Sequence, residues 1–333
     1  MGPAVRQLRT GRAFLFHGPS CGTMSAAIEV SGLVKRYGDL AAVDGIDFTV
    51  AAGTVFSFLG PNGAGKTTTT EILEGLRKRT AGDVQVLGLD PWNQGDELHR
   101  RIGVIPQDFR FFEKITPKEA IEYYRALFHT RVDPVELLQK VELADKLNSR
   151  YDTLSGGQKQ KLGLALALTN DPEICFLDEP TTGLDPHARR AIWEVIRTLK
   201  KEGRTVFLTT HYLEEAELLA DRVAIIHNGR IIAAGTPAEI IQEHGRPARM
   251  TVEGSPALAA YLQMNLGAAA VVEDGKVSVT LRDKGDALKI LTAIEESGLP
   301  WTSFTTTKDT LEDVFVRLVG QMDEGALKSG GRK

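Results

Sequence analysis

The N-terminal part of the chain alternates short apolar runs with glycine-rich turns. Polar and apolar positions alternate over residues 28–30 and 45–50, a pattern that predicts half-buried β-strands. Residues 54–59 form a continuous apolar, β-prone run, which is followed by a glycine-rich turn and by the helix-forming residues 71–76. This order of strand, loop and helix predicts the start of an α/β unit.

The middle of the chain changes from strand-like to helical patterning and back. Thr116 is expected to cap a helix whose first position is Pro117, and helical spacing continues to residue 168. Apolar strand-like runs then return between helical segments. These runs cover residues 174–177, 205–209 and 223–226. We therefore expect a largely parallel α/β core that carries a helical insert at about residues 108–170.

The C-terminal third predicts a second, smaller domain. Pro237 begins a short helix, and residues 245–247 contain the Gly and Pro that are typical of a boundary. Beyond it, strands and helices follow in the order βαββαβ, which predicts a small ferredoxin-like α+β domain. The strands are expected at residues 248–253, 268–273, 276–282 and 301–307, and the helices at residues 255–266 and 285–297. A further helix near Thr310 closes the domain.

These patterns divide the chain into four segments. Residues 1–23 are expected to be a disordered leader, because Met24 directly precedes the first well-patterned strand. Residues 24–245 form the large α/β domain, and residues 246–320 form the accessory domain. The polar residues 321–333 are expected to be a flexible tail.

Composition and charge restrict the functions open to these domains. Of the 333 residues, 42% are hydrophobic and 25% are charged, and the net charge of −4 argues against a dedicated nucleic-acid binder. Cys175 lies in an apolar run, and no Cys/His spacing suggests zinc or a disulfide framework, so we expect a cytoplasmic protein. No apolar stretch approaches the roughly 20 residues of a membrane helix. A link to a membrane must therefore come through a partner protein.

A glycine-rich loop after the apolar run at residues 54–59 matches the phosphate-binding pattern GxxxxGK[ST] in full. Its glycines let successive backbone N–H groups face phosphate oxygens. Lys66 supplies a positive charge to the β- and γ-phosphates of ATP, and the hydroxyl of Thr67 ligates Mg²⁺. The expected ATP-binding residues here are Gly60, Pro61, Asn62, Gly63, Ala64, Gly65, Lys66, Thr67 and Thr68.

A second motif is the apolar run at residues 174–177, which ends in Asp178 and Glu179. Ligands of open α/β sheets bind at the carboxyl ends of the strands. Asp178 is therefore positioned to hold Mg²⁺ through water, and Glu179 to accept a proton from the water that attacks ATP. Two acids after a strand can also be a simple helix cap, but the phosphate loop upstream favours the catalytic interpretation.

A third motif lies directly before the helical run at residues 159–168 and distinguishes this chain from other P-loop NTPases. It consists of Leu154, Ser155, Gly156, Gly157 and Gln158. Such residues at a helix N-terminus can present N–H groups and a hydroxyl to a phosphate; the alternative is a helix cap with flexible glycines. With this signature, the chain closely resembles the ABC ATPase family. The resemblance implies a RecA-like P-loop core with a helical insert, and ATP and Mg²⁺ as ligands.

The resemblance also assigns individual residues to the ATP site. Tyr37 corresponds to the aromatic residue that stacks on adenine, although an ordinary surface tyrosine is the alternative. Gln107 corresponds to the glutamine that touches Mg²⁺ and the attacking water, and His211 to a γ-phosphate contact. Together with Glu179, these two residues form the expected catalytic set. Asp185 lies in the loop that crosses to the opposing subunit.

The resemblance further implies that the chain works as a homodimer or heterodimer. Each ATP would lie between the phosphate loop of one subunit and Ser155, Gly156 and Gly157 of the other. ATP binding would close the pair, and hydrolysis would reopen it. Since no residue of the set is degenerate, we expect a site that is competent in hydrolysis.

A finer resemblance is carried by residues 209–217, 221–226, 235–237 and 311–315. They resemble the ATP-binding subunits of ABC-2-type exporters, the group that includes daunorubicin-resistance ATPases. This resemblance implies a separate polytopic membrane permease and a peripheral position of the chain on the cytoplasmic face of the cell membrane. It also implies export of drugs, lipids or other amphiphiles. The resemblance leaves open which molecule is transported and what the accessory domain does. The alternative is a non-transport ABC ATPase acting on ribosomes or nucleic acid. A single uninterrupted cassette without coiled-coil heptads favours transport and no nucleic-acid partner.

The helical insert is the segment that we expect to dock the permease. Apolar and aromatic residues around its start are candidates for this contact, and some of them are expected to belong to the core of the insert instead. They are Phe109, Phe111, Phe112, Tyr123 and Tyr124.

Overall fold

The computed structural model describes residues 25–266, 270–273, 276–283 and 285–330. The chain divides into two compact units, Met1–Pro237 and Ala238–Lys333. This division lies at the start of helix α8 (Pro237–His244), whereas the predicted boundary lies at its end. The leader predicted over residues 1–23 lies outside the described residues.

The first unit contains a six-stranded sheet with the order β5-β6-β7-β3-β8-β9. Neighbouring strands are parallel except at the edge, where β9 pairs antiparallel with β8. The strands are β3 (Val55–Leu59), β5 (Ile102–Ile105), β6 (Ile174–Asp178), β7 (Thr205–Thr210), β8 (Arg222–His227) and β9 (Arg230–Gly235). All residues of β3, β6 and β7 are buried, as expected for parallel strands covered on both faces. The predicted α/β fold with a largely parallel core is confirmed.

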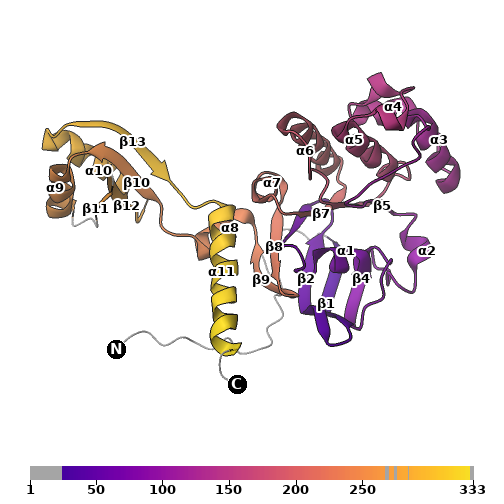
Figure 1. Ribbon diagram of the computed structural model, residues 1–333, viewed down its shortest axis with the longest axis horizontal. Coiled ribbons are helices and arrows are strands. Elements are labelled where there is room, and N and C mark those ends of the chain that lie inside the picture. Colours follow the sequence, from indigo (N-terminus) through magenta and orange to yellow (C-terminus); the bar gives the residue numbers. More distant parts are fainter. Residues whose placement is uncertain (1–24, 267–269, 274–275, 284, 331–333) are drawn as a thin grey trace. The chain divides into compact units, whose positions relative to one another are not determined.

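A second, antiparallel sheet of the first unit has the order β2-β1-β4 (Figure 1). Its strands are β1 (Ala26–Tyr37), β2 (Leu40–Ala51) and β4 (Ala81–Val86). Aromatic side chains join it to the parallel sheet: the ring centroid of Phe48 in β2 lies 5.6 Å from that of Phe56 in β3, and Phe207 of β7 lies beside both. Each buried Phe contributes about 1.5–3 kcal/mol to folding. This cluster fixes the two sheets next to α1 (Lys66–Leu73), which contacts both of them.

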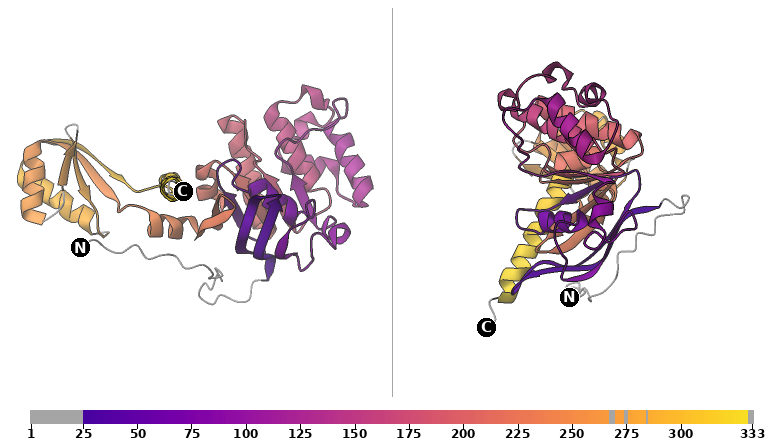
Figure 2. Two further views of the ribbon diagram at one scale, coloured as in Figure 1. Left: turned by 60° about the horizontal axis from the view of Figure 1, so that its bottom comes forward. Right: turned by 90° about the vertical axis from the view of Figure 1, so that its right-hand side faces the viewer.

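The predicted helical insert lies between β5 and β6. Thr116 caps α3 through a capping box with Glu119, and Pro117 is the first residue of the helix, as predicted. The helices of the first unit after α1 are α2 (Gly95–Leu98), α3 (Pro117–Phe128), α4 (Pro134–Lys140), α5 (Gly156–Ala167), α6 (Pro186–Lys201) and α7 (Leu213–Leu219), with 3₁₀ turns η1 (Ala144–Lys146) and η2 (Tyr151–Thr153). Figures 1 and 2 show the insert at the opposite end of this unit from β1, β2 and β4.

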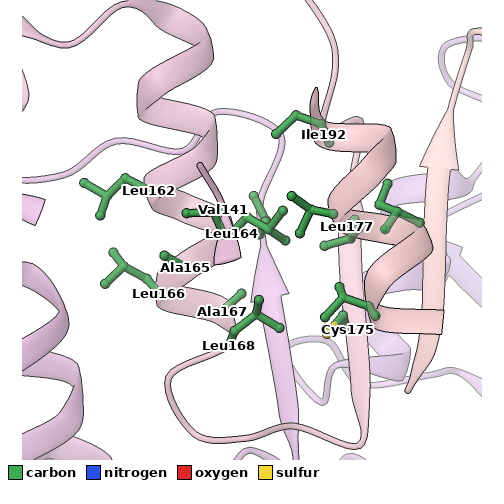
Figure 3. Close-up of a cluster of buried hydrophobic side chains, with 14 of the residues drawn as sticks. Val141, Leu162, Leu164, Ala165, Leu166, Ala167, Leu168, Cys175, Leu177 and Ile192 are labelled. Carbon is green, nitrogen blue, oxygen red and sulfur yellow. The ribbon is translucent and has the colours of Figure 1, made fainter. Parts of the chain in front are cut away.

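An apolar cluster anchors α5 of the insert to the parallel sheet (Figure 3). In this cluster, Leu164 and Leu168 from the α5 segment pack with Cys175 and Leu177 of β6 and with Ile192 of α6. Truncating a buried leucine to alanine typically costs about 2–5 kcal/mol, so the position of the insert depends on this contact. Cys175 is a buried small hydrophobe, as expected, and its burial raises the pKa of its thiol to about 12.

The second unit contains an antiparallel sheet with the order β11-β12-β10-β13. After α8, its elements are β10 (Arg249–Gly254), α9 (Pro256–Leu266), β11 (Ala270–Glu273), β12 (Lys276–Thr280), α10 (Asp286–Ser297), β13 (Trp301–Thr307) and α11 (Leu311–Gly330). Leu258 of α9 and Ile290 of α10 are buried in one cluster with Met250 and Val252 of β10, so both helices cover the same face of the sheet. The predicted βαββαβ order and ferredoxin-like fold are confirmed.

The last helix, α11, extends further than the sequence pattern predicts. Its first turn buries Leu311 and Val314, and Thr310 caps it through hydrogen bonds with Asp313. The helix continues to Gly330, so residues 321–330 are helical. Whether this tail is flexible stays a prediction.

Candidate active site

The loop between β3 and α1 wraps tightly because two of its glycines leave no room for a side chain. At Gly60, a Cβ atom would lie 2.4 Å from the backbone oxygen of Ile226 in β8. At Gly65, which has a φ of 108°, it would lie 2.5 Å from the backbone oxygen of Ala42 in β2. Only glycine fits both positions, and the loop therefore holds its backbone against the two sheets.

This loop borders a cavity of about 350 Å³, which we call the phosphate-loop cavity. The cavity brings together residues from the loop, from the start of α1 and from the ends of β5 and β6. Its walls are Ala42, Asn62, Gly63, Gly65, Lys66, Thr67, Thr68, Gln107 and Glu179. Predicted ATP-binding and catalytic residues that lie far apart in the sequence thus surround one volume.

Lys66 is 6% exposed and its ammonium group is held at the loop. Nζ donates hydrogen bonds to the backbone oxygens of Gly60, at 2.8 Å, and Pro61, at 3.2 Å, and lies 3.8 Å from Oε1 of Glu179. Burial lowers the pKa of Lys66, while the negative charges of Glu179 and Asp178 oppose that shift. The site thus places a positive charge directly beside the acid pair.

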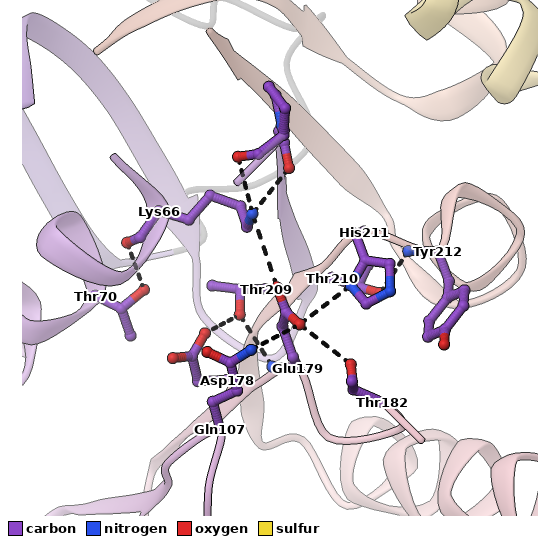
Figure 4. A network of polar contacts seen from close by, with 12 residues as sticks. Lys66, Thr70, Gln107, Asp178, Glu179, Thr182, Thr209, Thr210, His211 and Tyr212 are labelled. Carbon is purple, nitrogen blue, oxygen red and sulfur yellow. Dashed lines mark hydrogen bonds and ion pairs between the residues drawn. The ribbon is translucent and has the colours of Figure 1, made fainter. Parts of the chain in front are cut away.

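Glu179 is the centre of the polar network in Figure 4. Its Oε2 atom lies 3.1 Å from Nε2 of Gln107, 3.1 Å from Oγ1 of Thr182 and 3.1 Å from Nδ1 of His211. The residue is 7% exposed and has a φ of 48°, a left-handed conformation that costs a non-glycine residue about 1–2 kcal/mol. Its backbone N–H donates to Oγ1 of Thr209 at 3.1 Å. The structure therefore brings together Glu179, Gln107 and His211, the three residues of the expected catalytic set.

Asp178 precedes this residue at the end of β6 and is 7% exposed. One of its carboxylate oxygens, Oδ1, accepts a hydrogen bond from the hydroxyl of Thr209, its direct neighbour on β7. Burial raises the pKa of Asp178, and the Thr209 hydrogen bond opposes that shift. Sequence reasoning missed Thr209 and Thr182. The position of Thr209 at the end of an apolar strand was the only available signal for it.

The signature residues form the N-terminus of α5 and do not line the phosphate-loop cavity of their own chain. Ser155 caps the helix: its Oγ accepts from the backbone N–H of Gln158 at 3.3 Å, and Gln158 Oε1 accepts from the Ser155 N–H at 2.9 Å. Leu154 is buried, while Ser155 and Gly156 are exposed. Gly157 packs so closely that a Cβ atom would lie 2.8 Å from that of Ala188. Within one chain, Ser155 therefore acts as the N-cap of α5, which was the alternative interpretation of these residues.

Two further predicted residues lie outside the phosphate-loop cavity. Asp185 caps α6, and its carboxylate accepts hydrogen bonds from the N–H groups of His187 and Ala188 at 2.9 Å each, which lower its pKa. Tyr37 ends β1 and is 41% exposed. Its hydroxyl accepts a hydrogen bond from Arg77. Its stacking on adenine therefore stays a prediction.

The chain is similar to known ATP-binding proteins over most of its length. The family model described as "ABC transporter" matches residues 43–182, and the model described as "ATP-binding protein DrrA1-3-like, C-terminal domain" matches residues 235–319. The daunorubicin resistance ATP-binding protein DrrA3 of Streptomyces coeruleorubidus is 39% identical over 303 residues, which cover 88% of this chain and 96% of that protein. A Nod factor export ATP-binding protein I of Rhizobium meliloti is 37% identical over 315 residues, 91% of this chain and 93% of that protein.

Among solved structures, the chain is similar to a dimeric bacterial ABC transporter cassette. The TM-score is 0.56 and the identity 27%, over 63% of this chain and 98% of the cassette. The chain therefore belongs to the family of ABC transporter ATP-binding proteins. It is a nucleotide-binding subunit with ATPase activity, and the transporter interpretation from the sequence is confirmed. None of the described helices combines the length and the hydropathy needed to cross a bilayer.

Proposed function

We propose that Glu179 accepts the proton of the water that attacks the γ-phosphate of ATP, and that Gln107 and His211 position the reacting groups. The observation that carries this proposal is the convergence of Gln107, Thr182 and His211 on Oε2 of Glu179, each at 3.1 Å. These three side chains, from the loops after β5, β6 and β7, fix the direction of one carboxylate at the wall of the phosphate-loop cavity. A positioned general base of this kind contributes about 10²–10⁴-fold to a rate.

The phosphate-loop cavity is the proposed site of the ATP triphosphate. The backbone N–H groups of residues 62–65 and the hydroxyl of Thr68 would contact the phosphates, as expected at a helix N-terminus. Lys66 would face the β- and γ-phosphates, because its ammonium lies between the loop carbonyls and Glu179. The adenine would lie outside the cavity, against the exposed ring of Tyr37.

The residues at this site also fit a Mg²⁺ ion. Thr67 and Gln107, whose side chains carry oxygen atoms, line the cavity, and Asp178 adds a buried carboxylate held in place by Thr209. Oxygen donors of this kind are the ligands that Mg²⁺ prefers. We propose that Thr67 and Gln107 hold the ion directly and Asp178 through water. Bound there, Mg²⁺ would neutralise charge on the phosphates.

The complete site is proposed to need two chains, in a homodimer or a heterodimer. Within one chain, the exposed end of α5 at Ser155 and Gly156 does not line the phosphate-loop cavity. A helix N-terminus with exposed N–H groups favours an anion, which the second chain's ATP would supply. The similarity to a dimeric transporter cassette supports this arrangement.

The transport partner is proposed to be a separate polytopic membrane permease that docks on the helical insert. Among the candidate residues, Phe112 and Tyr123 are 67% and 55% exposed, whereas Phe109, Phe111 and Tyr124 pack against the core. Exposed aromatic residues are typical of the anchors of a protein interface. The names of the relatives concern drug resistance and Nod factor export, which supports export of amphiphilic drugs, lipids or similar molecules. The chain would then lie on the cytoplasmic face of the cell membrane and bind no nucleic acid.

Purification of the Glu179→Gln chain with ATP from detergent-solubilised native membranes tests this function. The variant should hold ATP without hydrolysing it and thereby trap the closed dimer on its permease. A polytopic membrane protein should co-purify with this variant, and less of it with Lys66→Ala, which should not bind ATP. Recovery of ribosomal or nucleic-acid partners without a membrane protein would overturn the transport proposal.

A further inference from the structure

A second cavity of the first unit, of about 260 Å³, shares no lining residue with the phosphate-loop cavity. It lies between the end of α1, the strand β5 and the helices α3 and α5 of the insert. The apolar part of its wall includes Leu76, Tyr124, Phe128 and Leu166. We call it the Glu74 cavity, after the one carboxylate residue in its wall.

Glu74 is 4% exposed, yet no described residue supplies a counter-charge to its carboxylate. In the part of the chain that the structure describes, the carboxylate forms no hydrogen bond or ion pair, and no lysine or arginine lines the cavity. The charged groups that act on its pKa are also acidic, namely Asp178 of β6 and Glu71 of α1. A buried carboxylate without a partner is costly, so this arrangement indicates a cation supplied from outside the chain.

Two other polar groups of the wall are already engaged with the backbone. Nε2 of His99 lies 2.8 Å from the backbone oxygen of Glu74, and the Asn170 amide donates to the backbone oxygen of Ile102 at 2.8 Å. Among the described residues, the Glu74 carboxylate and the Tyr124 hydroxyl of the wall form no hydrogen bond, and of these two only the carboxylate can carry a negative charge in the ordinary pH range. A ligand of this cavity should therefore be apolar along most of its length and carry one positive group.

Apolar surface is exposed at and near the cavity. Leu76, in its wall, is 63% exposed. Tyr123 and Leu127 do not line the cavity but directly precede the wall residues Tyr124 and Phe128 in the sequence of α3, and they are 55% and 59% exposed. Exposed apolar residues around a recessed charge fit a protein segment better than a small free cation, because a segment can cover the rim as well as fill the cavity.

We propose that the Glu74 cavity receives a lysine or arginine side chain from a helix of the membrane partner. The charged group pairs with Glu74, its methylene stem packs on the apolar wall, and the apolar residues of that helix cover Leu76, Tyr123 and Leu127. This inference rests on the proposed function, since it requires a transporter with a membrane partner. It adds the chemical identity of the docking residue, a base recognised by a buried acid.

A small-molecule probe tests the recognition without the partner. We would titrate the full chain with n-butylguanidinium and with its neutral analogue n-butylurea at pH 8.5, following the methyl NMR signals of Leu76 and Leu166. Butylguanidinium should shift these signals and bind at least about tenfold more tightly than butylurea, and Glu74→Gln should abolish the difference. Glu71→Gln, a neighbour on the same helix that does not line the cavity, should preserve it. Equal binding of the two probes, no binding, or an unchanged preference in Glu74→Gln would overturn the proposal.

A second experiment separates this inference from the proposed function. In the membrane purification, Glu74→Gln is added to the Glu179→Gln chain, with Glu71→Gln as the matched control. Recovery of the membrane protein should fall by at least about tenfold with Glu74→Gln and stay unchanged with Glu71→Gln. Equal recovery would overturn the Glu74 inference and leave the proposed function standing. Failure of the Glu179→Gln chain itself to recover a membrane protein would overturn the proposed function.

Discussion

Nδ1 of His211 lies 3.1 Å from Oε2 of Glu179, across the adjacent carboxyl ends of β7 and β6. An ionised carboxylate can only accept a hydrogen bond, so the imidazole is the donor when Glu179 is ionised. The exposed side of this pair is His211, whose side chain is 39% exposed, compared with 7% for Glu179. His211 therefore connects the buried acid to the protein surface.

Removing this contact should slow hydrolysis more than it weakens binding. His211→Ala should lower kcat about 10²-fold, because Glu179 loses a donor that orients it, and a misplaced catalytic group costs about this factor. The affinity for ATP should change only a few-fold. Steady-state ATPase rates and a nucleotide titration measure the two quantities, with His129→Ala at the exposed end of α3 as the control. An unchanged kcat would show that His211 does not position the base.

Lys66→Ala should act on binding itself. Nζ of Lys66 is the positive group beside the phosphate-loop cavity, and a hydrogen bond to a charged group contributes about 1.5–3 kcal/mol. ATP affinity should therefore fall at least about tenfold. Equilibrium titration of a fluorescent ATP analogue measures this change, with the exposed Lys114→Ala as the control. Unchanged affinity would contradict the assignment of this loop to the triphosphate.

Glu74 should make the stability of the free chain depend on pH. Burial, with the negative charges of Asp178 and Glu71, raises the pKa of Glu74 from 4.5 to about 8. Between these values the folded chain binds more protons than the unfolded chain, so the contribution of Glu74 to the free energy of unfolding falls as the pH rises. Glu74→Gln removes this loss. The variant should exceed the wild type by on the order of a few kcal/mol at pH 8.5 and match it near pH 4.

Urea unfolding at the two pH values measures this difference. Asp178 and Glu215, whose pKa values are also raised by burial, remain in both proteins, so the comparison isolates Glu74. If the free energies of unfolding of the variant and the wild type differ by the same amount at both pH values, the buried charge of Glu74 is not the cause of that difference.

Ser155 should have two separable roles, as a helix cap and as a contact to the other chain's ATP. Ser155→Ala should cost about 1 kcal/mol of stability and should also stop hydrolysis. Ser155→Asp keeps a capping oxygen but places a negative charge toward the phosphate, so it should retain stability and still stop hydrolysis. Thr116→Ala removes the capping box of α3 and should cost similar stability without loss of ATPase activity. Thermal unfolding measures the stability of each variant, and ATPase rates measure its hydrolysis. Full ATPase activity in Ser155→Asp would show that Ser155 acts only as a helix cap.

Much of the site could be predicted because its residues lie at the ends of elements that the sequence marks clearly. Glu179 follows an apolar strand and Lys66 follows a glycine-rich turn, and parallel strands bring such ends to one edge. Thr209 could not be placed with them, because its contact with Asp178 depends on the register between β6 and β7. Thr182 lies in a loop without a pattern, and its contact with Glu179 depends on the turn that the left-handed Glu179 begins.

The fold was predictable to a similar degree. The apolar runs of β3, β6 and β7 and the βαββαβ order of the second unit indicated the architecture directly. The length of α11 was not predicted, since its residues after Gly320 are polar and carry no apolar spacing. The Glu74 cavity was also not predicted. A glutamate late in α1 looks like a surface residue until the insert is packed over it.

The most direct test of the account is the hydrolysis rate and ATP affinity of Glu179→Gln, measured on the same purified chain. The substitution keeps the shape of the side chain but removes its ability to accept the proton. The account predicts that turnover falls at least about 10²-fold while ATP affinity stays within a few-fold of the wild type, and that ATP-bound dimers accumulate. Glu173→Gln, an exposed acid paired with Arg101 outside the site, should leave both quantities unchanged. Wild-type turnover in Glu179→Gln would contradict the role of Glu179 as the base.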